Sequence, residues 1–250
     1  MEERSRRPAP RLVGLLACAV VTLPVLLVAG CSSHSGSGSG SHANSGSNPG
    51  SPSSKAPSGA GAVPTSTTPP PTPARFAAIP PACKAATTAT LATLVPKAKS
   101  PAGTATRTTD VQSRSGCSWT GNGPDGYQYR WLSVTLQRFG NDPQLGPAED
   151  QAKKRYAEQL QEVGKAAYGA PTTPLTGLGD EAAQVSGRTT VAKVTSQNDT
   201  VVAREGNVVV IVEYEGAGLA GKKNPDAKTV TSGAQRVARD ALTAVAAANA

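Results

Sequence analysis

Histidine is nearly absent from this sequence. The chain of 250 residues has two, His34 and His42, and both precede the part that we expect to fold, residues 75–250. That part therefore has no Ser-His or Cys-His pair for nucleophilic catalysis and no imidazole for a metal ion. It also lacks the S-x-x-K and G-x-S-x-G motifs of serine nucleophiles. These absences predict a protein that is not an enzyme, with no catalytic residue, no metal site and no cofactor.

Aromatic residues and clustered charge are also scarce. Aromatic residues make up 4% of the chain, and the net charge is +8. The basic residues are dispersed and are not interleaved with aromatic residues, as they are in many nucleic-acid-binding surfaces. We therefore expect no nucleic-acid partner. A mildly basic surface suits anionic lipid or wall polymer, although a solvated surface is the commoner explanation.

Residues 1–30 have the pattern of a secretory signal peptide. Four arginines near the start precede an uncharged stretch from Leu12 to Gly30, as in the basic and apolar regions of such peptides. The stretch is about 19 residues long, so an uncleaved membrane helix is the alternative. Both interpretations export the rest of the chain, because positive charge stays on the cytoplasmic side.

A cysteine follows the apolar stretch directly. The segment Val28-Ala29-Gly30-Cys31 resembles the lipobox of bacterial lipoproteins, in which the cysteine thiol receives a diacylglyceryl group and a peptidase cuts just before it. The resemblance implies that Cys31 is lipidated and that membrane lipid is its partner. Because two acyl chains bind a membrane more firmly than one, we expect the protein at the outer face of the cytoplasmic membrane.

Residues 31–74 combine this cysteine with a low-complexity tether. The tether is rich in serine and glycine and then in proline and threonine. Such a composition cannot bury apolar surface, so we expect disorder. About 43 residues of flexible chain have an r.m.s. length of roughly 35–40 Å. Residues 75–250 then form the extracytoplasmic domain.

Two cysteines remain for that domain. Cys18 falls in the predicted signal peptide, and Cys31 is the predicted lipid site. The remaining pair, Cys83 and Cys117, would lie in an oxidising compartment, so we expect a disulfide between them. Two buried free thiols are the alternative.

Hydrophobic periodicity predicts a single α+β domain. The apolar positions indicate an antiparallel sheet of about six strands, packed by helices and holding one disulfide. The run VVVIV at 208–212 is apolar on both faces, which places its strand centrally in the sheet. We expect helices over 88–95, 147–163 (ended by Gly164) and 226–248, and strands over 115–120, 127–139, 181–186, 189–196, 200–205 and 207–215.

Several short motifs resemble one family. They are the helix at Cys83, the strand Cys117-Ser118-Trp119, the sequence GLGDEA at 177–182 and the closing hairpin with its helix. Together they resemble the secreted actinobacterial lipoproteins of domain-of-unknown-function family 3558. The layout is also similar to the extracellular sensor domain of some mycobacterial serine/threonine kinases. Lys84-Ala85-Ala86 departs from the more apolar family pattern. The resemblance implies export, lipidation and a disulfide, but no reaction.

An aromatic row is the best candidate for a ligand site. Tyr127, Tyr129 and Trp131 alternate along one predicted strand, so they share a face. Rings with polar tips suit glycans or amphiphiles. The simpler alternative is that a helix covers this face and that the rings are core residues. Leu132, Val134 and Leu136 form the opposite, core-facing side of the strand.

Two carboxylate pairs leave other functions open. Asp180/Glu181 and Glu213/Glu215 could serve a wall-directed enzyme, but glycosidases need carboxylates that face each other across a bond. The sequence GNGPDG at 121–126 matches a phosphate-loop pattern, yet a strand follows it, so we interpret it as a hairpin turn. We therefore expect a binding or sensing module. The alternatives are a carboxylate enzyme and a structural partner of a membrane protein.

Overall fold

A computed structural model describes residues 72–166 and 170–250 of the chain. The predicted signal peptide, the lipid site at Cys31 and nearly all of the predicted tether lie outside the described residues. Among the residues that are described, no helix is both long enough and apolar enough to cross a membrane.

The described residues form one antiparallel sheet packed by helices, which confirms the predicted α+β class. The sheet has seven strands in the order β1-β2-β3-β7-β6-β5-β4. Every neighbouring pair is antiparallel. The strands are β1 (Thr104–Ala105), β2 (Arg114–Asn122), β3 (Gln128–Arg138), β4 (Thr172–Leu175), β5 (Glu181–Val191), β6 (Val194–Glu205) and β7 (Val208–Gly218).

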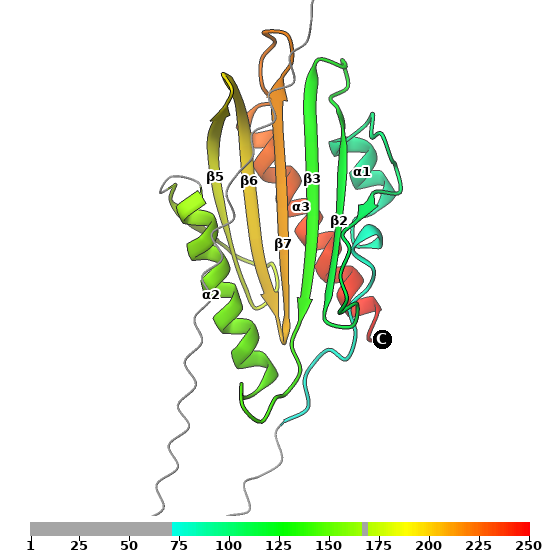
Figure 1. The fold of residues 1–250 in the computed structure, drawn as a ribbon, viewed down its shortest axis with the longest axis vertical. Helices are drawn as coiled ribbons and strands as arrows, with labels where there is room; N and C mark the ends of the chain where they lie inside the picture. The colour runs from blue at the N-terminus through cyan, green and yellow to red at the C-terminus, as the bar shows by residue number, and fades with distance from the viewer. Residues whose placement is uncertain (1–71, 167–169) are drawn as a thin grey trace, which may run out of the picture. The chain divides into compact units, whose positions relative to one another are not determined.

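Helices lie on both faces of this sheet. Figure 1 shows α3 crossing behind the sheet and α2 along its lower left part. Side-chain oxygens of Thr87 and Asp226 cap the first turns of α1 and α3, where they accept hydrogen bonds from the backbone N–H groups of Thr90 at 3.1 Å and Thr229 at 2.7 Å. The helical segments are η1 (Ala82–Lys84, a 3-10 turn), α1 (Thr88–Leu94), α2 (Ala148–Ala166) and α3 (Ala227–Ala247).

The apolar core divides between the two faces. On the α3 side, Leu132, Val134 and Leu136 of β3 are completely buried in the larger cluster. On the other face, Tyr156 of α2 packs with β6 and β7 in a smaller cluster. Strand β7 lies between β3 and β6, and its residues Val208–Val212 are buried. The central placement expected for this strand is therefore confirmed.

The predicted disulfide is present. Cys83 and Cys117 are bonded, with their Cα atoms 5.0 Å apart, so η1 is linked covalently to β2. The segment before β1 packs closely on this link. Gly103 has φ +80°, and a Cβ there would collide with the Cys117 sulfur and the Trp119 ring. Glycine meets both requirements at once.

The predicted division of residues 181–205 into three strands is wrong. The structure has two long strands, β5 and β6, joined by a tight turn at Ala192-Lys193. Both turn residues have positive φ, 48° and 67°. The segments Ser-Gly-Arg at 186–188 and Gln-Asn-Asp at 197–199 lie inside strands, although their composition is typical of turns.

Three smaller expectations also differ from the structure. Helix α2 continues through Gly164 to Ala166, because one glycine weakens a helix by only about 1 kcal/mol and need not end it. The edge strands β1 and β4 were not predicted. They have two and four residues, which is too short for a hydrophobic period to be visible.

The residues that precede the first helical turn are bonded to the β6–β7 end of the sheet. Asn207, completely buried in the β6–β7 turn, accepts a hydrogen bond from the Phe76 N–H at 2.8 Å. Its amide donates to the carbonyls of Phe76 at 2.9 Å and Phe139 at 2.6 Å. Arg75 also pairs with Glu205 at 2.7 Å. The chain therefore enters the domain at the β6–β7 turn, the lower end in Figure 1.

Candidate functional site

Helix α2 covers only part of its face of the sheet. Ala152 and Tyr156 pack on Val202, Val209 and Ile211, which lie near the β6–β7 turn. Further from that turn, the described residues place no helix over the same face. We call this uncovered part the open face. An antiparallel sheet tolerates such a face when it is polar, because its other side already supplies the core.

Three rows of side chains cross the open face. Strand register fixes the composition of each row, because directly paired residues project to the same side of a sheet. The rows are Tyr129–Ala217–Ser196–Thr189, Trp131–Glu215–Asn198–Gly187 and Ser133–Glu213–Thr200–Val185.

The register brings two separate sequence candidates together. Trp131 pairs directly with Glu215, and Ser133 with Glu213, so the aromatic row and one carboxylate pair share the open face. Trp131 and Tyr129 are half-buried, and neither belongs to the two apolar clusters. Their rings therefore form part of the open face.

Tyr127 is separated from this group. Its side chain is 52% exposed in the turn before β3. The Lys222 ammonium lies 5.0 Å from the centre of its ring, within the range of a cation–π contact. Of the three predicted ligand residues, the structure thus places Tyr129 and Trp131 beside the glutamates and Tyr127 at the sheet end.

The glutamates carry charge that is not neutralised by an ion pair within the described part of the chain. Glu213 accepts a hydrogen bond from the Ser133 hydroxyl at 2.9 Å. The pKa of Glu215 is raised by burial and then by the charge of Glu213. The pKa of Tyr129 is also raised, first by burial and then by Glu215, against a hydrogen bond with Thr120. A cation at this position would oppose both effects, because a nearby positive charge favours the ionised carboxylate.

Asn198 completes the polar centre of the open face. When its amide oxygen accepts from the Thr189 hydroxyl at 2.7 Å, its amide nitrogen donates to Glu215 at 3.3 Å. No role for Asn198 could be recognised from the sequence, because the residues around it are typical of a turn. Only the observed β6–β7 pairing places it opposite Glu215.

Three shallow hollows adjoin one another here. The largest has about 250 Å³ and lies between Tyr129, Glu215 and the β5–β6 hairpin. A hollow of about 130 Å³ lies at Trp131, and another of about 140 Å³ borders the end of α2 at Val163. All three share Asn198. Together they make a shallow depression rather than a deep pocket.

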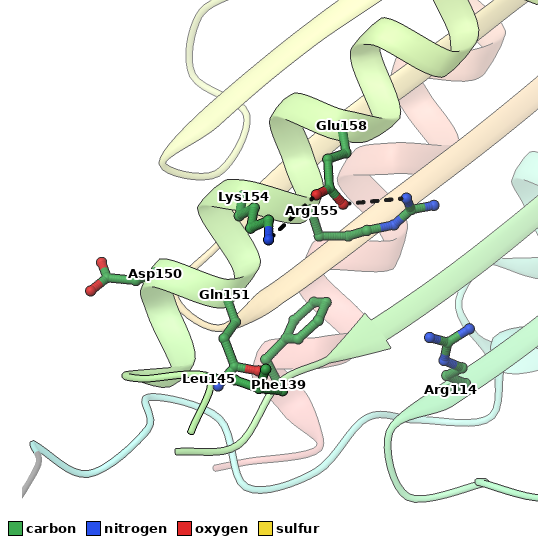
Figure 2. A pocket seen from close by; sticks show the side chains of 8 residues that line it. All are labelled: Arg114, Phe139, Leu145, Asp150, Gln151, Lys154, Arg155 and Glu158. Carbon is green, nitrogen blue, oxygen red and sulfur yellow. Dashed lines mark ion pairs between the residues drawn. The ribbon is translucent and has the colours of Figure 1, made fainter. Parts of the chain in front are cut away.

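A larger groove lies between α2 and the lower part of β2 and β3. It has about 600 Å³, and Figure 2 shows Phe139 between the helix and Arg114. The helix neutralises much of its own charge, because Glu158 pairs with Lys154 and Arg155, each at 3.9 Å. Arg155 also donates to Gln137 at 3.0 Å. Since these contacts are made within the fold, the groove offers little unsatisfied chemistry.

The other carboxylate pair has a structural role. Asp180 and Glu181 both pair with the buried Arg204, at 3.1 and 2.7 Å. Asp180 also accepts from the Gly206 N–H at 2.7 Å. These bonds neutralise a buried cation and hold the start of β5 at the β6–β7 turn, so both carboxylates are engaged in contacts within the fold.

The glycine-rich segment 121–126 forms the predicted hairpin turn. The Gly126 N–H donates to the Gly123 carbonyl at 2.9 Å, and Gly126 has φ +81°. The turn leads into β3 rather than into a helix, so no helix N-terminus follows it to bind a phosphate. Among the described residues, no group of three or more metal-ligating side chains could hold a metal ion.

No protein-family model matches the chain, and no curated protein matches it significantly.

Proposed function

We propose that this protein is a lipid-anchored binding module of the cell envelope whose ligand lies on the open face. The observation that carries the proposal is the row in which Trp131 stands beside Glu215, with Tyr129 and Glu213 on either side. These four side chains lie together on a polar sheet face that the described helices leave uncovered.

The chemistry of the open face favours a ligand with a free amine. The electron-rich faces of tryptophan and tyrosine attract cations, and hydrogen bonds between an ammonium and a carboxylate are stronger than neutral ones. Glu213 and Glu215 have no basic partner among the described residues. Sugar rings also pack well on aromatic side chains with polar tips. A wall-polymer fragment that carries an amine satisfies both requirements.

The sequence supports the location of the module. The lipobox resemblance at Cys31 and the basic, then apolar, residues before it favour export and lipidation. The proposed tether would hold the domain within reach of the wall. A disulfide suits this oxidising compartment, and the resemblance to secreted lipoproteins of domain-of-unknown-function family 3558 implies the same location.

The geometry is less suited to carboxylate catalysis. Glu213 and Glu215 are alternate residues of one strand, so they project side by side from the same face. Glycosidases instead place two carboxyl groups on opposite sides of the scissile bond. The adjoining hollows are also shallow and open, and such a site does not exclude water from a reacting bond.

Substitution at the open face tests the proposal. Trp131→Ala and Glu215→Gln are expected to reduce capture of amine-bearing wall fragments at least tenfold, while the melting temperature changes by only a few degrees. Leu145→Ala is the matched control, because Leu145 is 70% exposed and lies outside the open face. Unchanged capture by both variants would refute the proposal. A large fall in melting temperature for Trp131→Ala would instead make Trp131 a core residue.

A further inference from the structure

Four exposed apolar side chains form one row across the end of the sheet. They are Tyr127, Leu219, Val194 and Val191, with exposed fractions of 52%, 37%, 52% and 70%. Val194 pairs with Val191, and the Leu219 N–H donates to the Tyr127 carbonyl at 2.8 Å. This apolar end row is the next row outward from Tyr129 on the sheet.

The clustering of these side chains is unusual for the surface of this domain. The described residues have six large apolar side chains with high exposure, and four of them are in the apolar end row. They lie in or beside three connections: the turn before β3, the β5–β6 turn and the loop after β7. Figure 1 shows these connections together at the upper end of the sheet. Contiguous exposed apolar groups mark a contact surface, whereas single ones do not.

Lysines surround the apolar end row. Lys193 lies in the β5–β6 turn, Lys222 and Lys223 lie in the loop after β7, and Lys97 lies beside Gly126 in the turn before β3. None of these lysines forms an ion pair within residues 72–166 and 170–250. The acidic residue of the turn before β3 is Asp125, and its carboxylate accepts a hydrogen bond from the Tyr127 N–H at 2.9 Å.

We infer that the apolar end row docks on an anionic lipid surface. Apolar side chains at hairpin tips can enter the boundary between headgroups and acyl chains, while the surrounding lysines contact lipid phosphates. A protein partner would require a complementary acidic rim with an apolar centre. A bilayer that contains anionic lipid provides both negative charge and an apolar interior across its whole surface. The proposed lipid anchor brings the domain to such a bilayer.

The length of the chain before the domain permits this orientation. Arg75 is bound at the β6–β7 turn, the end of the sheet opposite the apolar end row. β3 has 11 residues, so it spans about 37 Å at ~3.4 Å per residue. A connection of about 43 residues can extend to roughly 140 Å, which is enough to run along the sheet. The open face would then be held next to the membrane surface.

Fluorophore quenching by lipid tests the docking. The full chain is reconstituted in vesicles containing brominated lipid, either neutral or with anionic phosphatidylglycerol, and labelled at Val194→Cys or, as a control, at Leu145→Cys. We expect strong quenching at position 194 only in anionic vesicles, and weak quenching at position 145 in both. In the background of Lys193→Gln and Lys223→Gln, the ratio of docked to undocked chain should fall about 25-fold, at about fivefold per lysine.

Two outcomes would overturn the inference. Equal quenching at positions 194 and 145 in anionic vesicles would show that this end of the sheet has no preference for lipid. Quenching at position 194 that is unaffected by the lysine substitutions would show that anionic lipid is not what it recognises. The inference rests on the proposed membrane location, and a failure of that location is detected separately as loss of flotation of the chain with neutral vesicles.

Discussion

Asp199 should make this domain less stable as the pH rises toward neutrality. Its side chain is 1% exposed on the α3 side of the sheet. One carboxyl oxygen accepts from the Ser186 hydroxyl at 2.8 Å, and the other has no hydrogen-bond partner among the described residues. Burial raises the pKa of Asp199 to about 7, against a smaller opposing effect of the Ser186 hydrogen bond.

The sign of the effect follows from proton binding. Between pH 3.8, the ordinary pKa of the group, and about 7, the folded state holds the Asp199 proton while the unfolded chain releases it. The free energy of unfolding therefore falls as the pH rises through this range and is level above it. A shift of about 3 units corresponds to roughly 4 kcal/mol at most.

The variant Asp199→Asn removes the titrating group and keeps its shape. Above pH 7 the variant should gain up to roughly 4 kcal/mol over the charged form, less about 1–3 kcal/mol for an amide without an acceptor. Urea unfolding from pH 4.5 to 8 measures the difference between the two proteins at each pH. Parallel stability curves for the two proteins would refute the reasoning. Asp226→Asn is the control. Hydrogen bonds donated by Thr229 lower the pKa of Asp226 below its ordinary 3.8, so this carboxyl group does not titrate between pH 4.5 and 8.

Three further predictions concern the anchoring and stability of the domain. Cys117→Ser should lower the free energy of unfolding by roughly 3–4 kcal/mol, because the disulfide closes a 34-residue separation; equal stability of the variant and of the oxidised wild type in urea would contradict this. Asn207→Ala should cost roughly 2–4 kcal/mol, because it leaves buried backbone groups of Phe76 and Phe139 without partners, and faster amide exchange at Phe76 should accompany the loss. Cys31→Ala should abolish metabolic labelling with a palmitate analogue, and label retained on the variant would exclude lipidation at this residue.

The core strands could be predicted because their side chains have clear periods. In β3, the buried Leu132, Val134 and Leu136 alternate with less buried residues. In β7, residues 208–212 are apolar on both faces. These patterns predict which face of β3 meets the core and that β7 is central in the sheet. The β5–β6 hairpin could not be predicted in the same way. Its turn residues Ala192 and Lys193 have positive φ, which is unfavourable for L-residues by roughly 1–2 kcal/mol each. Eleven paired positions between the strands impose that turn.

The candidate site was visible in the sequence only as separate parts. The tyrosine–tryptophan alternation and the Glu213/Glu215 pair could each be recognised as one face of a strand. The aromatic residues and the glutamates lie side by side because β3 pairs with β7. In the chain, α2 and three strands separate β3 from β7. No local pattern encodes that choice of neighbour. The apolar end row was missed for a related reason, because it exists only when three turns lie at one end of a sheet.

Tryptophan fluorescence tests the central claim, ligand binding at the open face, most directly. The chain has two tryptophans: Trp119 is buried at 1% exposure in the core, and Trp131 stands on the open face. Titration with amine-bearing wall fragments should produce a saturable change in emission that is absent from Trp131→Phe and strongly reduced when the amine of the fragment is acetylated. No saturable change in the wild type, or the same change in Trp131→Phe, would contradict the account.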